Sequence, residues 1–112
     1  MIRTLIFAGA LALAAGPAFA DEPIVGNWKT ASGDTAHIAS CGGSYCIVLK
    51  TGKYAGKKIG TLAGSGVSYS GQITDPANDK TYSGSGNVLG NSLKMKGCVL
   101  NVLCKSQTWT RL

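Results

Sequence analysis

The sequence has little of what most enzymes depend on. Its 112 residues include one histidine, five acidic residues and three prolines, and 14% of the residues are charged. This length allows one small domain and excludes an architecture with two cores. The glycines follow no three-residue period, which excludes a collagen-like chain. With 45% hydrophobic residues, the composition is that of a folded chain rather than a disordered one.

The first twenty residues have the composition of a secretory leader. Arg3 precedes an apolar run over residues 5–15, and Ala18-Phe19-Ala20 has the small-x-small pattern of a signal peptidase site. The run is shorter than the ~20 residues that span a bilayer, which argues against a retained anchor. We therefore predict a signal peptide over residues 1–20 with cleavage after Ala20. The mature chain, residues 21–112, is expected to be a single soluble domain in the periplasm and not an integral membrane protein.

The four cysteines form an even set in a chain that we expect to be exported, a pattern that predicts two disulfides. Of the three possible connectivities, the spacing favours Cys41–Cys46 and Cys98–Cys104, because each pair flanks a short segment that a hairpin would close. Each bond would stabilise the domain by about 2 kcal/mol on the chain-entropy account. Neither pair has the CxxC spacing of zinc sites and redox-active thiols, which makes these alternatives weaker.

Hydrophobic residues alternate with polar ones along most of the mature chain, and the runs are separated by glycine-rich turns. No segment after residue 21 has a helical period. Eight short strands joined by tight turns predict an all-β fold, an antiparallel meander closed or nearly closed into a barrel, since closure removes exposed edges. The expected strands are residues 24–30, 34–40, 45–50, 58–63, 67–74, 80–89, 92–98 and 104–111.

The two ends of the mature chain support closure of the meander. Gly26 and Trp28 lie on one face of the first expected strand, and Trp109 and Arg111 lie on one face of the last. The first and last strands are neighbours in a closed meander, so the Arg111 guanidinium is expected to stack on the Trp28 ring as a cation–π contact. Gly-x-Trp with a terminal Arg is similar to the pattern of lipocalin-like and avidin-like barrels.

A series of short motifs along the mature chain resembles domain-of-unknown-function family 2147, a family of small exported bacterial proteins. The resemblance implies a lipocalin-like barrel and a location in the cell envelope. It implies no reaction and no catalytic residues. The motifs that carry it are Gly26-x-Trp28-Lys29-Thr30, Gly52-Lys53-x-x-Gly56-Lys57-x-Ile59-Gly60, Ser70-Gly71-x-Ile73-x-Asp75-Pro76, Lys80-Thr81-Tyr82, Leu93-Lys94-x-Lys96-Gly97-Cys98 and Gln107-Thr108-Trp109-Thr110-Arg111.

Four lysines, Lys50, Lys53, Lys57 and Lys58, surround Tyr54 and form the densest charge cluster of the chain. Such a cluster can bind an anionic envelope component or membrane surface, although short charge runs are more often solvated loops. The spacing lacks the P-loop pattern, which argues against nucleotide binding. Nucleic acid is an improbable partner for an exported chain.

Candidate catalytic and metal-binding residues are sparse. His37 lies inside an expected strand without a neighbouring nucleophile or orienting acid, so a structural or exposed position is favoured over a catalytic one. Asp75, Asn78 and Asp79 do not fit the calcium-loop pattern and are typical of a turn. We therefore predict neither an enzymatic activity nor a cofactor or metal.

Three aromatic residues of the expected barrel interior, Trp28, Tyr69 and Tyr82, share a face with glycines. Small residues beside rings can leave room for one small ligand inside an eight-stranded barrel. Strand glycines can instead relieve crowding, and the scarcity of large apolar side chains slightly favours a filled core. The sequence thus predicts a monomeric, non-enzymatic exported protein that binds a small apolar ligand or envelope component. The alternative is an interaction or structural module whose basic surface contacts an anionic partner.

Overall fold

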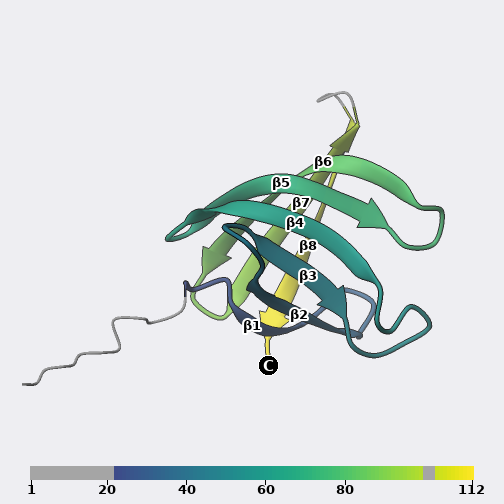
Figure 1. The fold of residues 1–112 in the computed structure, drawn as a ribbon, viewed down its shortest axis with the longest axis horizontal. Helices are drawn as coiled ribbons and strands as arrows, with labels where there is room; N and C mark the ends of the chain where they lie inside the picture. The colour runs from purple at the N-terminus through teal and green to yellow at the C-terminus, as the bar shows by residue number, and fades with distance from the viewer. Residues whose placement is uncertain (1–21, 100–102) are drawn as a thin grey trace, which may run out of the picture.

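The computed structural model describes residues 22–99 and 103–112, so the expected leader of residues 1–20 lies outside the described residues (Figure 1). The described chain is all-β and contains eight strands. They are β1 (Gly26–Lys29), β2 (Thr35–Ser40), β3 (Tyr45–Leu49), β4 (Lys58–Ser65), β5 (Ser68–Asp75), β6 (Lys80–Leu89), β7 (Ser92–Val99) and β8 (Leu103–Arg111).

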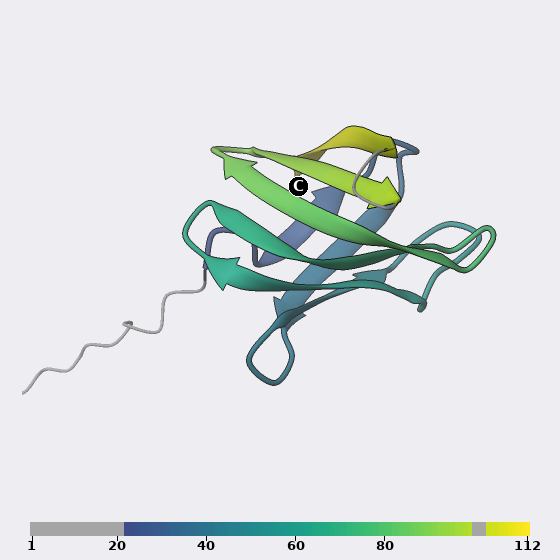
Figure 2. The same cartoon turned by 90° about the horizontal axis from the view of Figure 1, so that it is seen from above.

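The strands form a closed antiparallel meander in which each strand pairs with the next along the chain (Figures 1 and 2). Pairing of β1 with β8 completes the barrel, with Trp28 opposite Arg111 and Lys29 opposite Thr110. The predicted fold class is therefore confirmed. Closure pairs the two outermost strands, which would otherwise be exposed edges.

The interior follows from the alternation of side chains along the strands. Inward positions carry the core residues, whereas outward positions carry mainly serine, threonine and lysine. The alternation is broken once, where a bulge lies opposite Ile47 and Val48 and turns both Ile59 and Gly60 of β4 inward. The buried hydrophobic residues are Ile24, Trp28, Ala36, Ile38, Ile47, Leu49, Ile59, Leu62, Tyr69, Val88, Leu93, Met95 and Trp109.

The turns of a meander alternate between the two ends of its barrel. The β2–β3, β4–β5 and β6–β7 turns lie at the end where the chain enters and leaves the barrel, which we call the closed end. The β1–β2, β3–β4, β5–β6 and β7–β8 connections lie at the opposite, open end. Figures 1 and 2 both show the β3–β4 and β5–β6 connections extending on the same side of the molecule.

The closed end is covered by the segment before β1, residues 22–25. Ile24 of this segment is fully buried, and its carbonyl accepts a 2.9 Å hydrogen bond from the Trp28 indole N–H. The Arg111 guanidinium lies over the Trp28 ring, 4.2 Å from its centroid, and donates to the carbonyl of Pro23 at 2.7 Å. A side chain on Gly26 would lie 3.4 Å from Arg111, so this glycine leaves space for the guanidinium.

A second group of contacts fixes the same segment to the β4–β5 turn. The Tyr69 hydroxyl donates to the carbonyl of Gly66 at 2.8 Å and lies 3.3 Å from the Glu22 carboxylate. That carboxylate accepts a 2.7 Å bond from the Gly66 backbone N–H. Burial, followed by the charge of Glu22, raises the pKa of Tyr69 to about 12, because both disfavour the phenolate. The Tyr45 ring packs edge-on against Tyr69.

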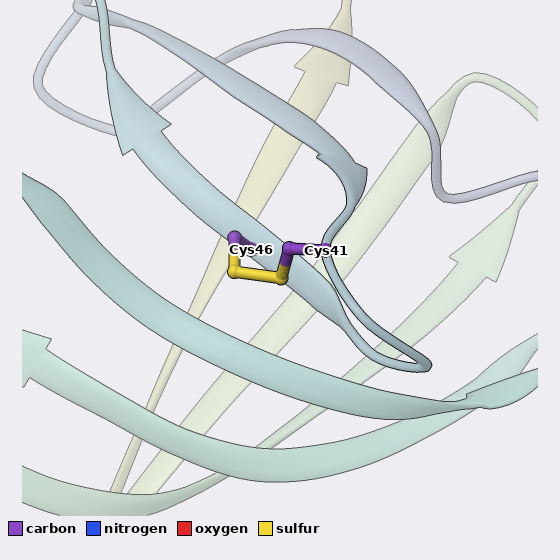
Figure 3. The surroundings of a disulfide bond; sticks show 2 residues. All are labelled: Cys41 and Cys46. Carbon is purple, nitrogen blue, oxygen red and sulfur yellow. A yellow bond between two sulfur atoms is a disulfide. The ribbon is translucent and has the colours of Figure 1, made fainter.

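The two disulfides lie at opposite ends of the barrel. Cys41–Cys46 joins the residue after β2 to β3 at the closed end (Figure 3). Cys98–Cys104 joins facing residues of β7 and β8 towards the open end. These are the pairings that the sequence spacing favours, and they are consistent with an oxidising, exported location. Among residues 22–99 and 103–112, no helix is long and apolar enough to cross a membrane.

Candidate functional site

The open end of the barrel contains a pocket of about 400 Å³. This volume falls in the range of about 300–1,000 Å³ that is usual for small-molecule sites. The β1–β2, β3–β4 and β5–β6 connections supply its rim, and β6, β7 and β8 supply one wall. The lining residues are Thr30, Ser32, Asp34, Leu49, Lys53, Tyr54, Ile59, Ile73, Thr74, Asp75, Pro76, Ala77, Tyr82, Met95, Lys96, Gly97, Lys105, Gln107 and Trp109.

Apolar and aromatic side chains form the inner part of the pocket. Leu49, Ile59 and Met95 are buried, and Tyr82 is half-buried beside them in the lining. The indole N–H of Trp109 donates to the Gln107 side-chain oxygen at 2.8 Å. Because its polar atom is satisfied there, Trp109 presents an apolar ring to the pocket.

The prediction that Trp28, Tyr69 and Tyr82 together line a ligand site is wrong for two of the three. Tyr82 lines the pocket, but Trp28 and Tyr69 are buried at the closed end under residues 22–25. All three rings point inward, yet they lie at different heights along the barrel axis. The expectation of a filled core holds at the closed end and is wrong at the open end.

Gly84 and Gly86 of β6 do not account for this pocket. A side chain on Gly84 would collide with Ile73, at 2.5 Å, and one on Gly86 would approach Leu93 and Met95 at 3.3 Å. The space beside these glycines is therefore filled by neighbouring side chains. Of the two roles expected for strand glycines, these two therefore relieve crowding between neighbouring side chains and do not leave space for a ligand.

The four lysines of the predicted basic surface do not form one free cluster. Lys57 makes a 2.7 Å ion pair with Asp79 of the β5–β6 turn. Lys53 lies 5.6 Å from the Tyr54 ring centroid and lines the pocket. Lys50 and Lys58 are exposed, and neither is among the lining residues. Because Lys57 is already paired with Asp79, the four lysines do not form a single anion-binding surface.

The remaining polar candidates have structural partners. The His37 ring lies on the β1–β2 pair, 2.7 Å from the Asn27 side-chain oxygen, and is not among the lining residues. Asp75 accepts the backbone N–H of Ala77, and Asn78 accepts that of Lys80, which are turn contacts. Within residues 22–99 and 103–112, no three His, Cys, Asp or Glu side chains gather into a metal-binding group.

Most of the pocket residues were not predicted from the sequence to line a ligand site. Ile59 and Gln107 belong to the quoted motifs and Tyr54 lies among the four lysines, but none of the three was predicted to line a pocket. Their contribution depends on the bulge in β4, the β3–β4 connection and the open end of β8. For Gln107 the alternation with Trp109 gave a usable signal, since residues two apart in a strand share a face.

Comparison with known proteins identifies a family without a described activity. Residues 49–111, from the last residue of β3 through β8, match the model of the DUF2147 family, described as uncharacterized proteins conserved in bacteria. The Gly26-x-Trp28 block, part of the expected resemblance, lies outside this match. No curated protein and no solved structure matches the chain. The match covers more than half of the sequence, and the chain therefore belongs to the DUF2147 family of bacterial proteins.

Proposed function

We propose that this protein binds a small apolar molecule in the pocket at the open end of its barrel and is not an enzyme. The observation that carries the proposal is the pocket itself, about 400 Å³ and walled by Leu49, Ile59, Met95, Tyr82 and Trp109. Burying an apolar ligand against these side chains is favourable at roughly 25 cal/mol per Å² of apolar surface removed from water. The only histidine of the chain lies away from this pocket.

Binding of N-phenyl-1-naphthylamine tests the proposal. This neutral dye fluoresces in apolar surroundings, and we expect its emission to rise on titration with the oxidised protein. Energy transfer to the dye should reduce emission from Trp109, which lines the pocket. No enhancement at any protein concentration would overturn the proposal.

A variant that fills the pocket links the dye signal to the site. A side chain at Gly97 would begin 3.4 Å from Tyr82, inside the lining, so Gly97→Leu should weaken dye binding by about tenfold or more. Thr108→Leu adds the same side chain on the exposed outer face of β8 and is the matched control. Equal dye affinity of the folded Gly97→Leu variant and the wild type would place the dye elsewhere.

We also propose that the protein acts in the periplasm after removal of residues 1–20, as a monomer. The disulfides support an oxidising location, and the leader pattern at Ala18-Phe19-Ala20 supports export. The intact mass of protein purified from the envelope is expected to correspond to a chain that starts at Asp21 and contains two disulfides. A lipid adduct, or thiols that react before reduction, would contradict this location.

The second candidate function is contact between the basic β3–β4 connection and an anionic envelope component. Lys50, Lys53 and Lys58 are exposed and make no ion pair within the described ranges. Co-sedimentation with anionic vesicles over a salt series tests it, because attraction between exposed charges weakens as the Debye length falls. Absence of binding at low salt would remove this candidate.

A further inference from the structure

The rim of the pocket carries charges of both signs, and they differ in what they contact. Lys53, Lys96 and Lys105 line the pocket, as do Asp34 and Asp75. Lys105 shares the inward face of β8 with Gln107 and Trp109, since the three alternate along the strand. Lys53 and Lys105 thus bring cationic side chains from distant parts of the sequence to one opening, whereas Lys96 alternates to the outward face of β7.

The two aspartates are engaged in local contacts. The Asp75 carboxylate accepts the backbone N–H of Ala77 at 2.8 Å, which stabilises the β5–β6 turn. The Asp34 carboxylate lies against Gly52 and accepts the Ser32 hydroxyl at 3.3 Å. These bonds use part of the acceptor capacity of both carboxylates within the loops that hold them.

The lysines at the opening are not engaged in this way. Neither Lys53 nor Lys105 has a carboxylate oxygen within ion-pair distance among residues 22–99 and 103–112. Gln107 adds a further donor, because its side-chain oxygen accepts from Trp109 and its amide N–H groups remain for another acceptor. Lys105 and Gln107 thus both offer donors where β8 meets the opening.

We propose that the ligand of this pocket is a single-chain amphiphile with an anionic head group. The inference rests on the proposed binding function and names its ligand class. The apolar chain packs against Leu49, Ile59 and Trp109, and a carboxylate, sulfate or phosphate head lies at the opening beside Lys105 and Lys53. An anion of this kind matches both the apolar interior and the unpaired cations at the rim.

Displacement of the neutral dye by three amphiphiles of equal chain length tests the head group. Laurate, dodecanol and dodecyltrimethylammonium are titrated below their micelle-forming concentrations against the protein–dye complex. We expect laurate to displace the dye at about fivefold or more lower concentration than dodecanol, and the cation to be weakest. Equal displacement by laurate and dodecanol would overturn the anionic head group while leaving apolar binding intact. Stronger displacement by the cation would overturn it as well.

Lysine variants locate the head group. Lys105→Gln and Lys53→Gln should each weaken the binding of laurate by about fivefold and leave the affinity for dodecanol unchanged. The preference for laurate over dodecanol should decrease as salt is added. Lys94→Gln removes the same charge from the outer face of β7, away from the lining, and is the matched control. An equal loss of laurate affinity in Lys94→Gln would show a diffuse field effect and overturn the assignment.

Vesicles of phosphatidylglycerol distinguish a free amphiphile from a lipid held in a bilayer. We expect laurate to bind as a monomer and the dye-saturated protein to show no preference for these vesicles over neutral ones. Binding to the vesicles without displacement by laurate would overturn the proposal in favour of a membrane surface. If the dye itself does not bind, the proposed function fails before the head group is tested.

Discussion

The two ends of this barrel are built from the same strands and differ in what covers them. At the closed end, residues 22–25 place Ile24 beneath Trp28, and Arg111 covers the ring from outside. At the open end no such segment covers the inward side chains among the described residues, and a pocket of about 400 Å³ remains. Inward alternation alone therefore does not decide whether a barrel is filled; a covering segment does.

The difference also concerns hydrogen bonding. At the closed end the Tyr69 hydroxyl and the Glu22 carboxylate bond to the β4–β5 turn, and the Arg111 guanidinium bonds to carbonyls of residues 23 and 25. At the open end Lys53 and Lys105 have no ion-pair partner in the described ranges. Satisfied groups stabilise the fold, whereas unsatisfied ones at an opening are available to a ligand.

The largest expected effect comes from the two tryptophans, one at each end. Trp28→Ala should lower the free energy of unfolding by about 3–5 kcal/mol, since its ring is fully buried among protein atoms. Trp109→Ala should cost less, because one face of this ring borders the pocket and makes fewer packing contacts. Urea unfolding followed by circular dichroism measures both, and equal losses would contradict the difference between the ends.

Much of this comparison could be predicted from the sequence, because strand periodicity depends on local residues. The alternation of Tyr69 and Ile73 with serine and threonine predicted β5 to within a residue at each end. The pairing of Trp28 with Arg111 followed from closure of a meander. Both inferences need only the strand period and the order of the strands.

The position of the pocket could not be predicted in this way. Alternation tells which side chains point inward, but not how high they lie along the barrel axis. That height depends on the stagger of the strands and on where residues 22–25 fold, which no local pattern of the sequence specifies. The same applies to Lys57, whose partner Asp79 lies 22 residues away along the chain.

The disulfides give the next largest effect and separate stability from binding. Replacing Cys41 and Cys46 by serine should lower the free energy of unfolding by about 2 kcal/mol and leave dye binding unchanged, since this bond lies at the closed end. Replacing Cys98 and Cys104 should cost a similar amount. It should also weaken dye binding, because the neighbouring Gly97 and Lys105 line the pocket.

Paired unfolding curves and dye titrations of the two double variants measure this difference. The wild type under oxidising conditions is the reference for both. Loss of dye binding in the Cys41/Cys46 variant, measured on folded protein, would show that the closed end shapes the pocket after all.

Arg111 comes next, because its contribution is a stacking contact with two hydrogen bonds. Arg111→Ala should lower the free energy of unfolding by about 1–2 kcal/mol through loss of the cation–π contact and of packing on Trp28. Lys29→Ala, at an exposed position of β1, is the matched control and should change stability by less than about 0.5 kcal/mol. Thermal and urea unfolding check both, and equal effects would argue that the stack does not hold the closed end.

The smallest effect is that of the Tyr69 hydroxyl. Tyr69→Phe removes the bond to the Gly66 carbonyl and should cost about 1 kcal/mol at neutral pH. Tyr82→Phe is the control, because Tyr82 is half-buried at the open end and its hydroxyl makes no hydrogen bond with another described residue.

The stability difference between wild type and Tyr69→Phe should depend on pH, because the pKa of Tyr69 is raised in the folded state. An unfolded tyrosine has a pKa of about 10, whereas burial raises the pKa of Tyr69 in the fold to about 12. The fold therefore favours the neutral phenol, so its stabilising contribution is complete below pH 10 and is lost as the pH rises towards 12. The stability gap between wild type and Tyr69→Phe should narrow over that interval. Ultraviolet absorbance titration should show one tyrosine that ionises at higher pH than the others. If this late-ionising tyrosine is still seen in Tyr69→Phe, it is not Tyr69, and the raised pKa is wrongly assigned.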